Sequence, residues 1–203
     1  MKPKILMLVK GYLMGSKIYI TLLVFLVVLG SLKSQDIPPP NPSLVISIVS
    51  GHSVVFVFDE IDEYKNGILN AGQSTFIRIG AVADWKLQFN ADQSIFYGGN
   101  NPANQMELNN VGVVVISTGT HQDDGTNIIN YAKTAPVALE SNAITIMKKG
   151  TLSNKGYGIR NSFTFNWEMG TGRGNMNNQS MLEQFLAADT YNINIVLTLS
   201  FFP

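Results

Sequence analysis

Few side chains in this sequence could act as a catalytic base. There are two histidines, His52 and His121, and no cysteine, so a base-assisted serine would have to use one of these two rings. No Gly-x-Ser-x-Gly elbow occurs anywhere in the chain. The lack of cysteine also excludes a thiolate nucleophile, a disulfide framework and a Cys-ligated zinc. The sequence therefore predicts that the protein is not an enzyme.

Acidic residues cluster in two places where their oxygens could bind calcium. Asp59 and Asp62 belong to an acidic run that follows the apolar residues 54–58, and Asp123 and Asp124 are adjacent. Hard carboxylate oxygens are the ligands that Ca²⁺ prefers, which makes these four aspartates the candidate calcium ligands. Neither cluster has the glycine-turned loop of an EF-hand. The favoured interpretation is a solvated surface, with no metal and no other cofactor.

Aromatic and carboxylate side chains supply two alternative functions. Exposed rings can stack on sugars, and Tyr97, Tyr157 and Trp167 are the candidates in loops or at strand ends. Glu168 is the carboxylate best suited to cleave a glycosidic bond. In an alternating strand, however, we expect Glu168 on the solvent face and Trp167 in the core. A carbohydrate-binding module of the cell envelope is thus the second hypothesis, and a carboxylate-dependent envelope hydrolase is the third.

Alternating apolar residues predict the strands that position these side chains. In the clearest case, 85–89, Trp85, Leu87 and Phe89 share one face, and a period of two is typical of strands. The same pattern predicts strands at 44–49, 54–58, 76–79, 111–117, 137–139, 143–147, 162–169 and 191–202. Clusters of Gly, Asn and Asp provide the turns between them. We expect an all-β fold, an antiparallel β-sandwich of immunoglobulin-like type, with a single closed sheet as the alternative.

Only the segment 179–189 has the pattern of a helix. Ser180 and Glu183 have the spacing of a capping box, in which the two side chains accept each other's backbone N–H groups. Leu182 and Phe185 follow at helical spacing. The sequence therefore predicts one short helix near the C-terminus.

Residues 1–34 have the features of a cleaved signal peptide. Five lysines and no acidic residue precede position 35. The uncharged stretch 18–32 is shorter than the roughly 20 apolar residues that span a membrane. The prolines of 35–42 predict an extended linker, and 43–203 is then a single domain. We expect an exported protein at the cell surface, in the medium or in the periplasm, with an uncleaved anchor as the alternative.

Charge argues against a nucleic-acid partner. Fourteen Lys and Arg balance fourteen Asp and Glu over the whole sequence, but the part after residue 34 has nine basic and fourteen acidic residues, a net charge of −5. Binding to a phosphate backbone needs clustered lysine and arginine. We therefore expect no nucleic acid among the partners.

Several stretches resemble known secreted proteins. Residues 62–68, 75–79 and 84–89 resemble secreted β-sandwich proteins of the Bacteroidota, in which a Tyr-x-Asn-Gly turn leads to a strand and a Trp-containing pattern. Residues 188–200 resemble the last strand of pilin and spore-coat type fimbrial subunits. The resemblance implies a pilin-like sandwich with a structural or adhesive role at the cell surface, and it implies no catalytic residue.

The C-terminal strand is the candidate contact between subunits. Its apolar side carries Ile193, Ile195, Leu197 and Leu199, and an exposed edge strand can pair with a strand of a neighbouring chain. The sequence thus predicts a fimbria-like subunit whose partners are copies of itself or related surface subunits, joined by β-strand pairing. Glycans are the alternative ligands.

Overall fold

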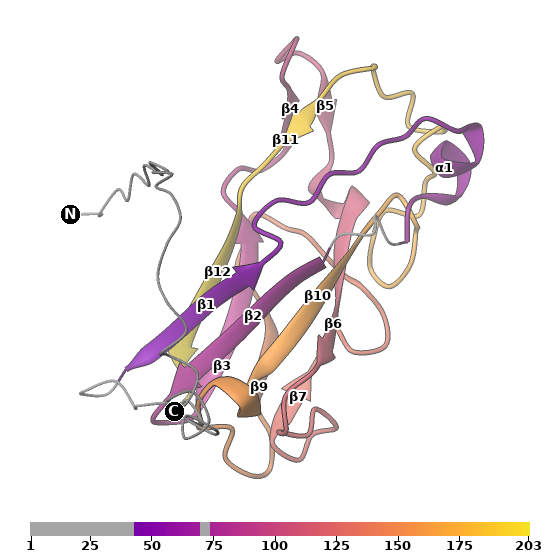
Figure 1. Ribbon diagram of the computed structural model, residues 1–203. Coiled ribbons are helices and arrows are strands. Elements are labelled where there is room, and N and C mark those ends of the chain that lie inside the picture. The colour runs from indigo at the N-terminus through magenta and orange to yellow at the C-terminus, as the bar shows by residue number, and fades with distance from the viewer. Residues whose placement is uncertain (1–42, 70–73) are drawn as a thin grey trace, which may run out of the picture. The chain divides into compact units, whose positions relative to one another are not determined.

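The computed structural model of the protein describes residues 43–69 and 74–203 (Figure 1). The predicted signal peptide and linker lie outside these described residues, and both remain predictions. Among the described residues, no helix has both the length and the apolar character needed to cross a bilayer.

The described chain is all-β and forms antiparallel sheets in a sandwich, which confirms the predicted fold class. Sheet A contains, in spatial order, β1 (Leu44–Ser50), β2 (Ser74–Ala81), β10 (Ser162–Met169), β6 (Val111–Ser117) and β8 (Val137–Ala138). Sheet B contains β12 (Ile195–Phe201), β3 (Trp85–Ala91), β9 (Ile144–Lys149) and β7 (Ile128–Asn130). The small sheet C contains β11 (Tyr191–Asn192), β4 (Phe96–Gly98) and β5 (Gln105–Met106).

The core lies between sheets A and B. Trp85, Leu87 and Phe89 of β3 are fully buried and alternate with half-buried polar residues, as the period-two pattern predicts. Across the interface the Trp85 ring meets the Phe163 ring edge-on, with centroids 6.0 Å apart. Burying a large apolar side chain contributes about 1.5–3 kcal/mol, so these residues are a main source of the sandwich's stability.

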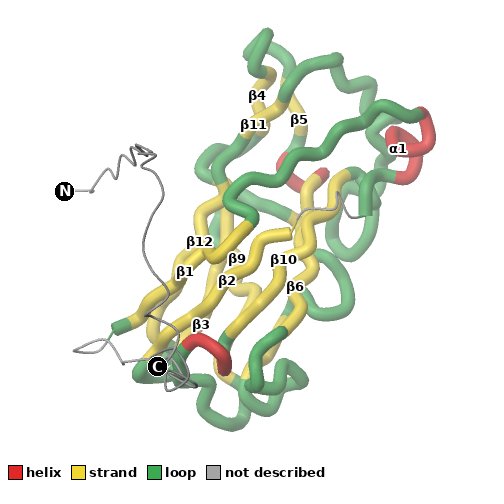
Figure 2. The backbone as a smooth tube through the Cα atoms, viewed as in Figure 1, coloured by secondary structure: helices red, strands yellow, loops and turns green. Residues whose placement is uncertain are grey.

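Antiparallel strands place the connecting loops at two ends of the sandwich (Figure 2). One end, which we call the α1 end, carries 51–69, 92–110, 139–143 and 170–194. The opposite end, which we call the C-terminal end, carries 82–84, 118–127 and 150–161. The strand register fixes this division, because Phe201 at the end of β12 lies opposite Trp85 at the start of β3.

The structure places 54–58 in none of the three sheets of the described residues, so the strand predicted there is not found. The ladder between β1 and β2 is irregular between Ile48 and Ser50, and Gly51 then adopts a φ of 72°. Strand β2 is described from Ser74 onward, and 54–58 is part of none of the ladders between the described strands. The segment keeps its alternation, with the even-numbered side chains packed on the core and the odd-numbered ones exposed.

The α-helix of the described residues is α1 (Ile61–Asn66), not a helix at 179–189. The capping box predicted near the C-terminus is formed, since the Ser180 N–H lies 2.9 Å from Glu183 Oε2 and the Glu183 N–H lies 3.2 Å from Ser180 Oγ. It begins only a set of turns over 181–185. Phe185 adopts a φ of 50°, a left-handed conformation that cannot continue a right-handed helix.

The acidic run before α1 starts the helix instead of closing a strand. Glu63 Oε2 accepts the backbone N–H groups of Asp59, at 2.9 Å, and Glu60, at 3.2 Å. These bonds from the backbone hold the pKa of Glu63 below its usual value. Two short 3₁₀ helices, η1 (Leu108–Asn110) and η2 (Gly158–Arg160), complete the described elements.

Candidate functional site

Sheets A and B each have an outer strand on the same side of the sandwich. These are β1 and β12, which contact each other without pairing (Figure 1). Within the described residues, β1 pairs with β2 alone and β12 pairs with β3 alone. Each of these two strands therefore has one edge that is hydrogen-bonded to no other strand of the described residues.

An apolar groove opens between these two edges and extends to the α1 end, with a volume of about 1140 Å³. One wall consists of Ile46 and Ile48 of β1 and the inward side chains of segment 54–58. The other wall contains Ile193, Ile195 and Leu197, which were predicted as pairing residues and which are half-buried against the core. Leu199, further along β12, also packs on the core but does not line the groove.

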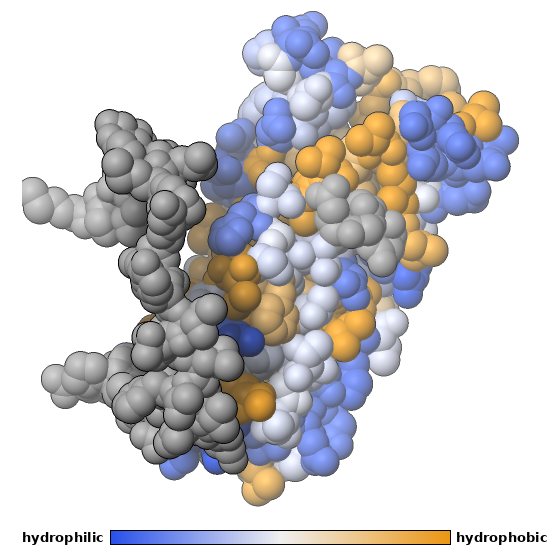
Figure 3. All heavy atoms as spheres, viewed as in Figure 1, coloured by the Kyte–Doolittle hydropathy of each residue, from blue (hydrophilic) through white to orange (hydrophobic). Residues whose placement is uncertain are grey.

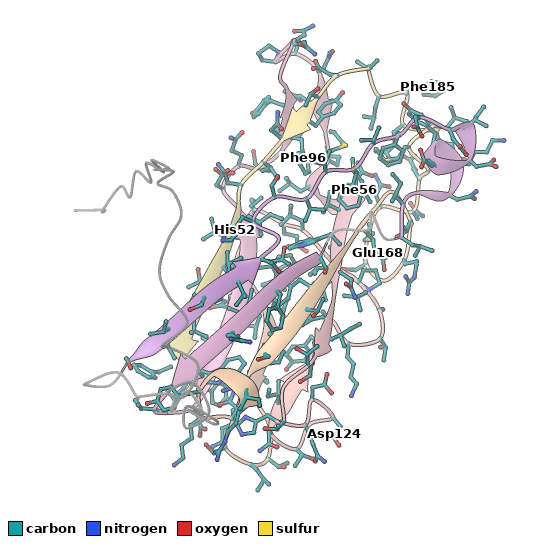
Figure 4. The ribbon with its side chains drawn as sticks, viewed as in Figure 1. His52, Phe56, Phe96, Asp124, Glu168 and Phe185 are labelled. Atoms are coloured by element: carbon teal, nitrogen blue, oxygen red, sulfur yellow. The ribbon has the colours of Figure 1, made fainter. Side chains whose placement is uncertain are left out.

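The base of the groove is built from side chains of sheet A, sheet C and the turns 181–185. It contains Phe96, Met106, Val111, Trp167, Met169 and Met181. Figure 4 shows Phe56 of the extended segment and Phe96 of β4 in this region. Large apolar side chains and few charged ones make the groove suited to apolar side chains of a partner.

The extended segment is fixed at its far end by α1. Tyr64 donates its hydroxyl to the Phe58 carbonyl oxygen at 3.0 Å, and the two rings pack with centroids 5.3 Å apart. Beyond this anchor the side chains of Val55 and Val57 are exposed. Figure 3 shows hydrophobic residues gathered on this part of the surface.

Asp189 ties the other wall of the groove to sheet C. Its Oδ1 accepts the backbone N–H and the side-chain amide of Asn100, both at 2.9 Å. Its Oδ2 accepts the backbone N–H of Asn101 at 3.1 Å and the side-chain amide of Asn104 at 2.9 Å. The pKa of Asp189 lies far below its usual value, and the main cause is the hydrogen bond from the backbone N–H of Asn100. None of the sequence patterns predicted this cluster, although the Asn-rich loop beside β4 was a signal for it.

Glu168 is buried, which overturns the expected position on the solvent face. Its side chain is 3% exposed, and its oxygens bind Arg173 Nη1 at 2.6 Å and Thr171 Oγ1 at 2.9 Å. Glu168 is buried because the loop after β10 folds back over the strand. Glu168 holds this loop in place (Figure 4), and both of its oxygens have structural partners.

The aromatic residues proposed to stack on sugars do not form one surface. Trp167 is buried and donates its Nε1–H to Thr75 Oγ1 at 3.0 Å, so it is a core residue. Tyr97 is 41% exposed at the α1 end. Tyr157 belongs to a loop at the C-terminal end and is half-buried, with its ring over Gly80.

The candidate calcium ligands lie at opposite ends of the sandwich. Asp59 and Asp62 are at the start of α1, whereas Asp123 and Asp124 are in a loop of the C-terminal end, where Figure 4 labels Asp124. Asp123 pairs with Lys133 Nζ at 2.7 Å. In 43–69 and 74–203, no three His, Asp or Glu side chains gather closely enough to hold a metal ion.

The two histidines lie far from each other and have different neighbours. His52 is exposed and lines the groove near Gly51. His121 Nδ1 lies 2.9 Å from Asn161 Oδ1 and belongs to a buried network at the C-terminal end. Among the contacts of the described residues, neither histidine ring lies against a serine hydroxyl.

No protein-family model matches this chain, and none of the curated proteins compared with it is significantly similar. The resemblance to fimbrial subunits therefore stays a prediction. The geometry of the groove is the basis on which function can be argued.

Proposed function

We propose that the protein is an exported structural or adhesive subunit of the cell surface. It is a fimbria-like, non-catalytic subunit that assembles with copies of itself or related subunits. The observation that carries this proposal is the apolar groove between the outer strands β1 and β12.

The groove offers a partner strand both backbone and side-chain interactions. A strand added beside β1 or β12 would pair with backbone groups at an edge that has no strand beside it in the described part of the chain. Its alternate side chains would enter the groove, where each buried Val, Leu or Ile contributes about 1.5–3 kcal/mol.

The side chains along the outer edge of β12 also support binding of another strand. Natural sheets protect long edges with charges or prolines, because an open apolar edge recruits other strands. The outward side chains of β12, Val196 and Thr198, carry no charge. An edge that pairs with no strand among the described residues, and that carries no charge on its outward side, supports an interface with another subunit.

The proposal is tested by shearing intact producing cells and analysing the released material on gels with and without boiling. We expect a ladder of high-mass bands that collapses to the monomer on boiling. Ile193→Glu, in the groove wall, should remove the ladder. Ile116→Glu, on the outer face of β6, is the matched control and should keep it, because Ile116 is exposed away from the groove.

Circular dichroism of both variants separates assembly from folding. If the wild-type protein is found only as a soluble monomer, or if folded Ile193→Glu still forms the ladder, assembly at the groove is refuted.

A further inference from the structure

Charge is strongly segregated between the two halves of the sandwich. Among the described residues, the half toward the C-terminal end has only three carboxylates, Asp84, Asp123 and Asp124, and seven of the nine cations. The half toward the α1 end has the other ten carboxylates and two cations, Lys65 and Arg173. The formal charges of the two halves are therefore +4 and −8, which sum to −4 for the described residues.

The negative end also presents an exposed apolar surface. Phe185 is 93% exposed at the tip of the turns 181–185, and Ile61 of α1 is 64% exposed. The Leu182 N–H donates to the Tyr64 carbonyl oxygen at 3.1 Å, which holds these turns against α1. We call this surface, made of Ile61, Leu182 and Phe185 with Asp59 and Asp62 beside them, the acidic face.

The positive end has a matching surface on the loop between β9 and β10. Ile159 is 70% exposed and Leu152 is 58% exposed. Lys155 and Arg160 belong to the same loop and are exposed, and neither takes part in an ion pair between described residues. We call these four residues the basic face.

We propose that a second copy of the chain docks end to end, with its basic face against the acidic face of the first copy. This inference rests on the proposed function and adds a second contact to strand pairing. Opposite charges around apolar residues are the arrangement that steers and orients protein association. Because the two faces differ, the contact is head-to-tail, and each subunit keeps a free face for the next copy.

Charge complementarity is the reason for choosing a second copy as the partner. The faces are opposite in sign, are both centred on exposed aliphatic or aromatic side chains, and lie at opposite ends of one domain. Attraction between exposed charges is screened within about 10 Å at 0.1 M salt. The end-to-end contact should therefore weaken as salt increases, unlike the apolar groove.

A charge-swap experiment with the purified exported protein tests this contact by sedimentation velocity. Asp59→Lys with Asp62→Lys replaces the aspartates of the acidic face by lysines, so that both docking faces carry cations, and Lys155→Glu with Arg160→Glu gives both faces carboxylates. In dilute buffer we expect each variant alone to lose the association of the wild type. An equimolar mixture of the two should regain it, with an association constant at least tenfold above that of either variant alone.

Phe185→Asn tests the apolar part of the acidic face without threatening the fold. Asn tolerates the positive φ of this position better than Phe does, so the variant should fold normally while its association weakens at least fivefold. Ile193→Glu should leave the salt-sensitive association intact, which separates a failure of this inference from a failure of strand pairing in the groove.

Three results would overturn the end-to-end contact. They are a wild-type protein that is equally monomeric in dilute and concentrated salt, a mixture of the charge-swap variants that stays monomeric, and association that is unchanged in each variant alone. A monomeric wild type that binds a lysine-rich peptide through Asp59 and Asp62 would assign the acidic face to a different, basic partner.

Discussion

Asn154 and Trp85 are joined by three hydrogen bonds that satisfy the backbone of β3 where it starts. The Trp85 N–H donates to Asn154 Oδ1 at 3.0 Å, and Asn154 Nδ2 donates to the Trp85 carbonyl oxygen at 2.9 Å. The Trp85 indole N–H in turn donates to the Asn154 carbonyl oxygen at 2.8 Å. Asn154, a loop residue, thus provides Trp85 with the two backbone hydrogen bonds that a neighbouring strand would otherwise provide.

Asn154→Ala should destabilise the fold by about 3 kcal/mol, because it leaves the buried N–H and carbonyl of Trp85 without partners. Urea unfolding followed by tryptophan fluorescence measures the change. The control is Asn66→Ala on the exposed surface of α1, which should change stability by less than about 0.5 kcal/mol. Equal effects of the two substitutions would contradict this role for Asn154.

Asp189→Asn should lower the melting temperature at pH 7, and the difference from wild type should shrink in acid. The pKa of Asp189 is lower in the folded protein than its usual value of about 3.9. Its stabilising effect is therefore complete above the unfolded-state pKa and is lost as pH falls toward the folded-state pKa. Calorimetry from pH 7 to pH 2 measures this change. A difference that is independent of pH would show that the charge of Asp189 does not hold the loop.

Arg173→Met should destabilise the protein by about 2 kcal/mol, because it removes the cation that compensates the buried Glu168 carboxylate. The double variant with Glu168→Gln should recover part of this loss, since no buried charge remains. A double-mutant cycle by chemical unfolding gives the coupling. Additive effects of the two substitutions would mean that the ion pair does not fix the loop after β10.

Gly51→Ala should cost more stability than Gly125→Ala, although both glycines have a positive φ. A Cβ atom at Gly51 would lie 2.0 Å from the Ser74 carbonyl oxygen, whereas a Cβ at Gly125 meets no atom within 4 Å. We expect about 1 kcal/mol for Gly125→Ala from backbone strain alone and at least about 2 kcal/mol for Gly51→Ala. Parallel urea titrations compare them, and a smaller loss for Gly51→Ala would contradict the close approach of β1 to Ser74.

Local patterns predict much of this fold and little of the groove. The alternation of 85–89 shows directly which side of β3 is buried, because it depends only on the period of the side chains. The same alternation at 54–58 gives an extended chain that belongs to none of the three sheets of the described residues. Gly51, with its positive φ, redirects the chain between β1 and this segment.

Long-range packing explains the remaining differences. The local pattern places Glu168 on the solvent face, but the loop that carries Arg173 covers it in the folded protein. Ser180 and Glu183 form their capping box, yet the left-handed Phe185 stops the helix. Asp189 gathers amides from residues more than 80 positions away, a relationship that no local spacing encodes.

The first and last strands of the described residues, β1 and β12, also determine how the domain responds to mechanical load. Leu44 lies opposite Ala81, and Phe201 lies opposite Trp85, so the outer ends of both strands flank the same short turn, 82–84. A force pulling these two ends apart would peel each strand from its neighbour one hydrogen bond at a time, instead of shearing a whole ladder at once. A second strand bound in the groove would hold both edges together and raise the force at which peeling begins.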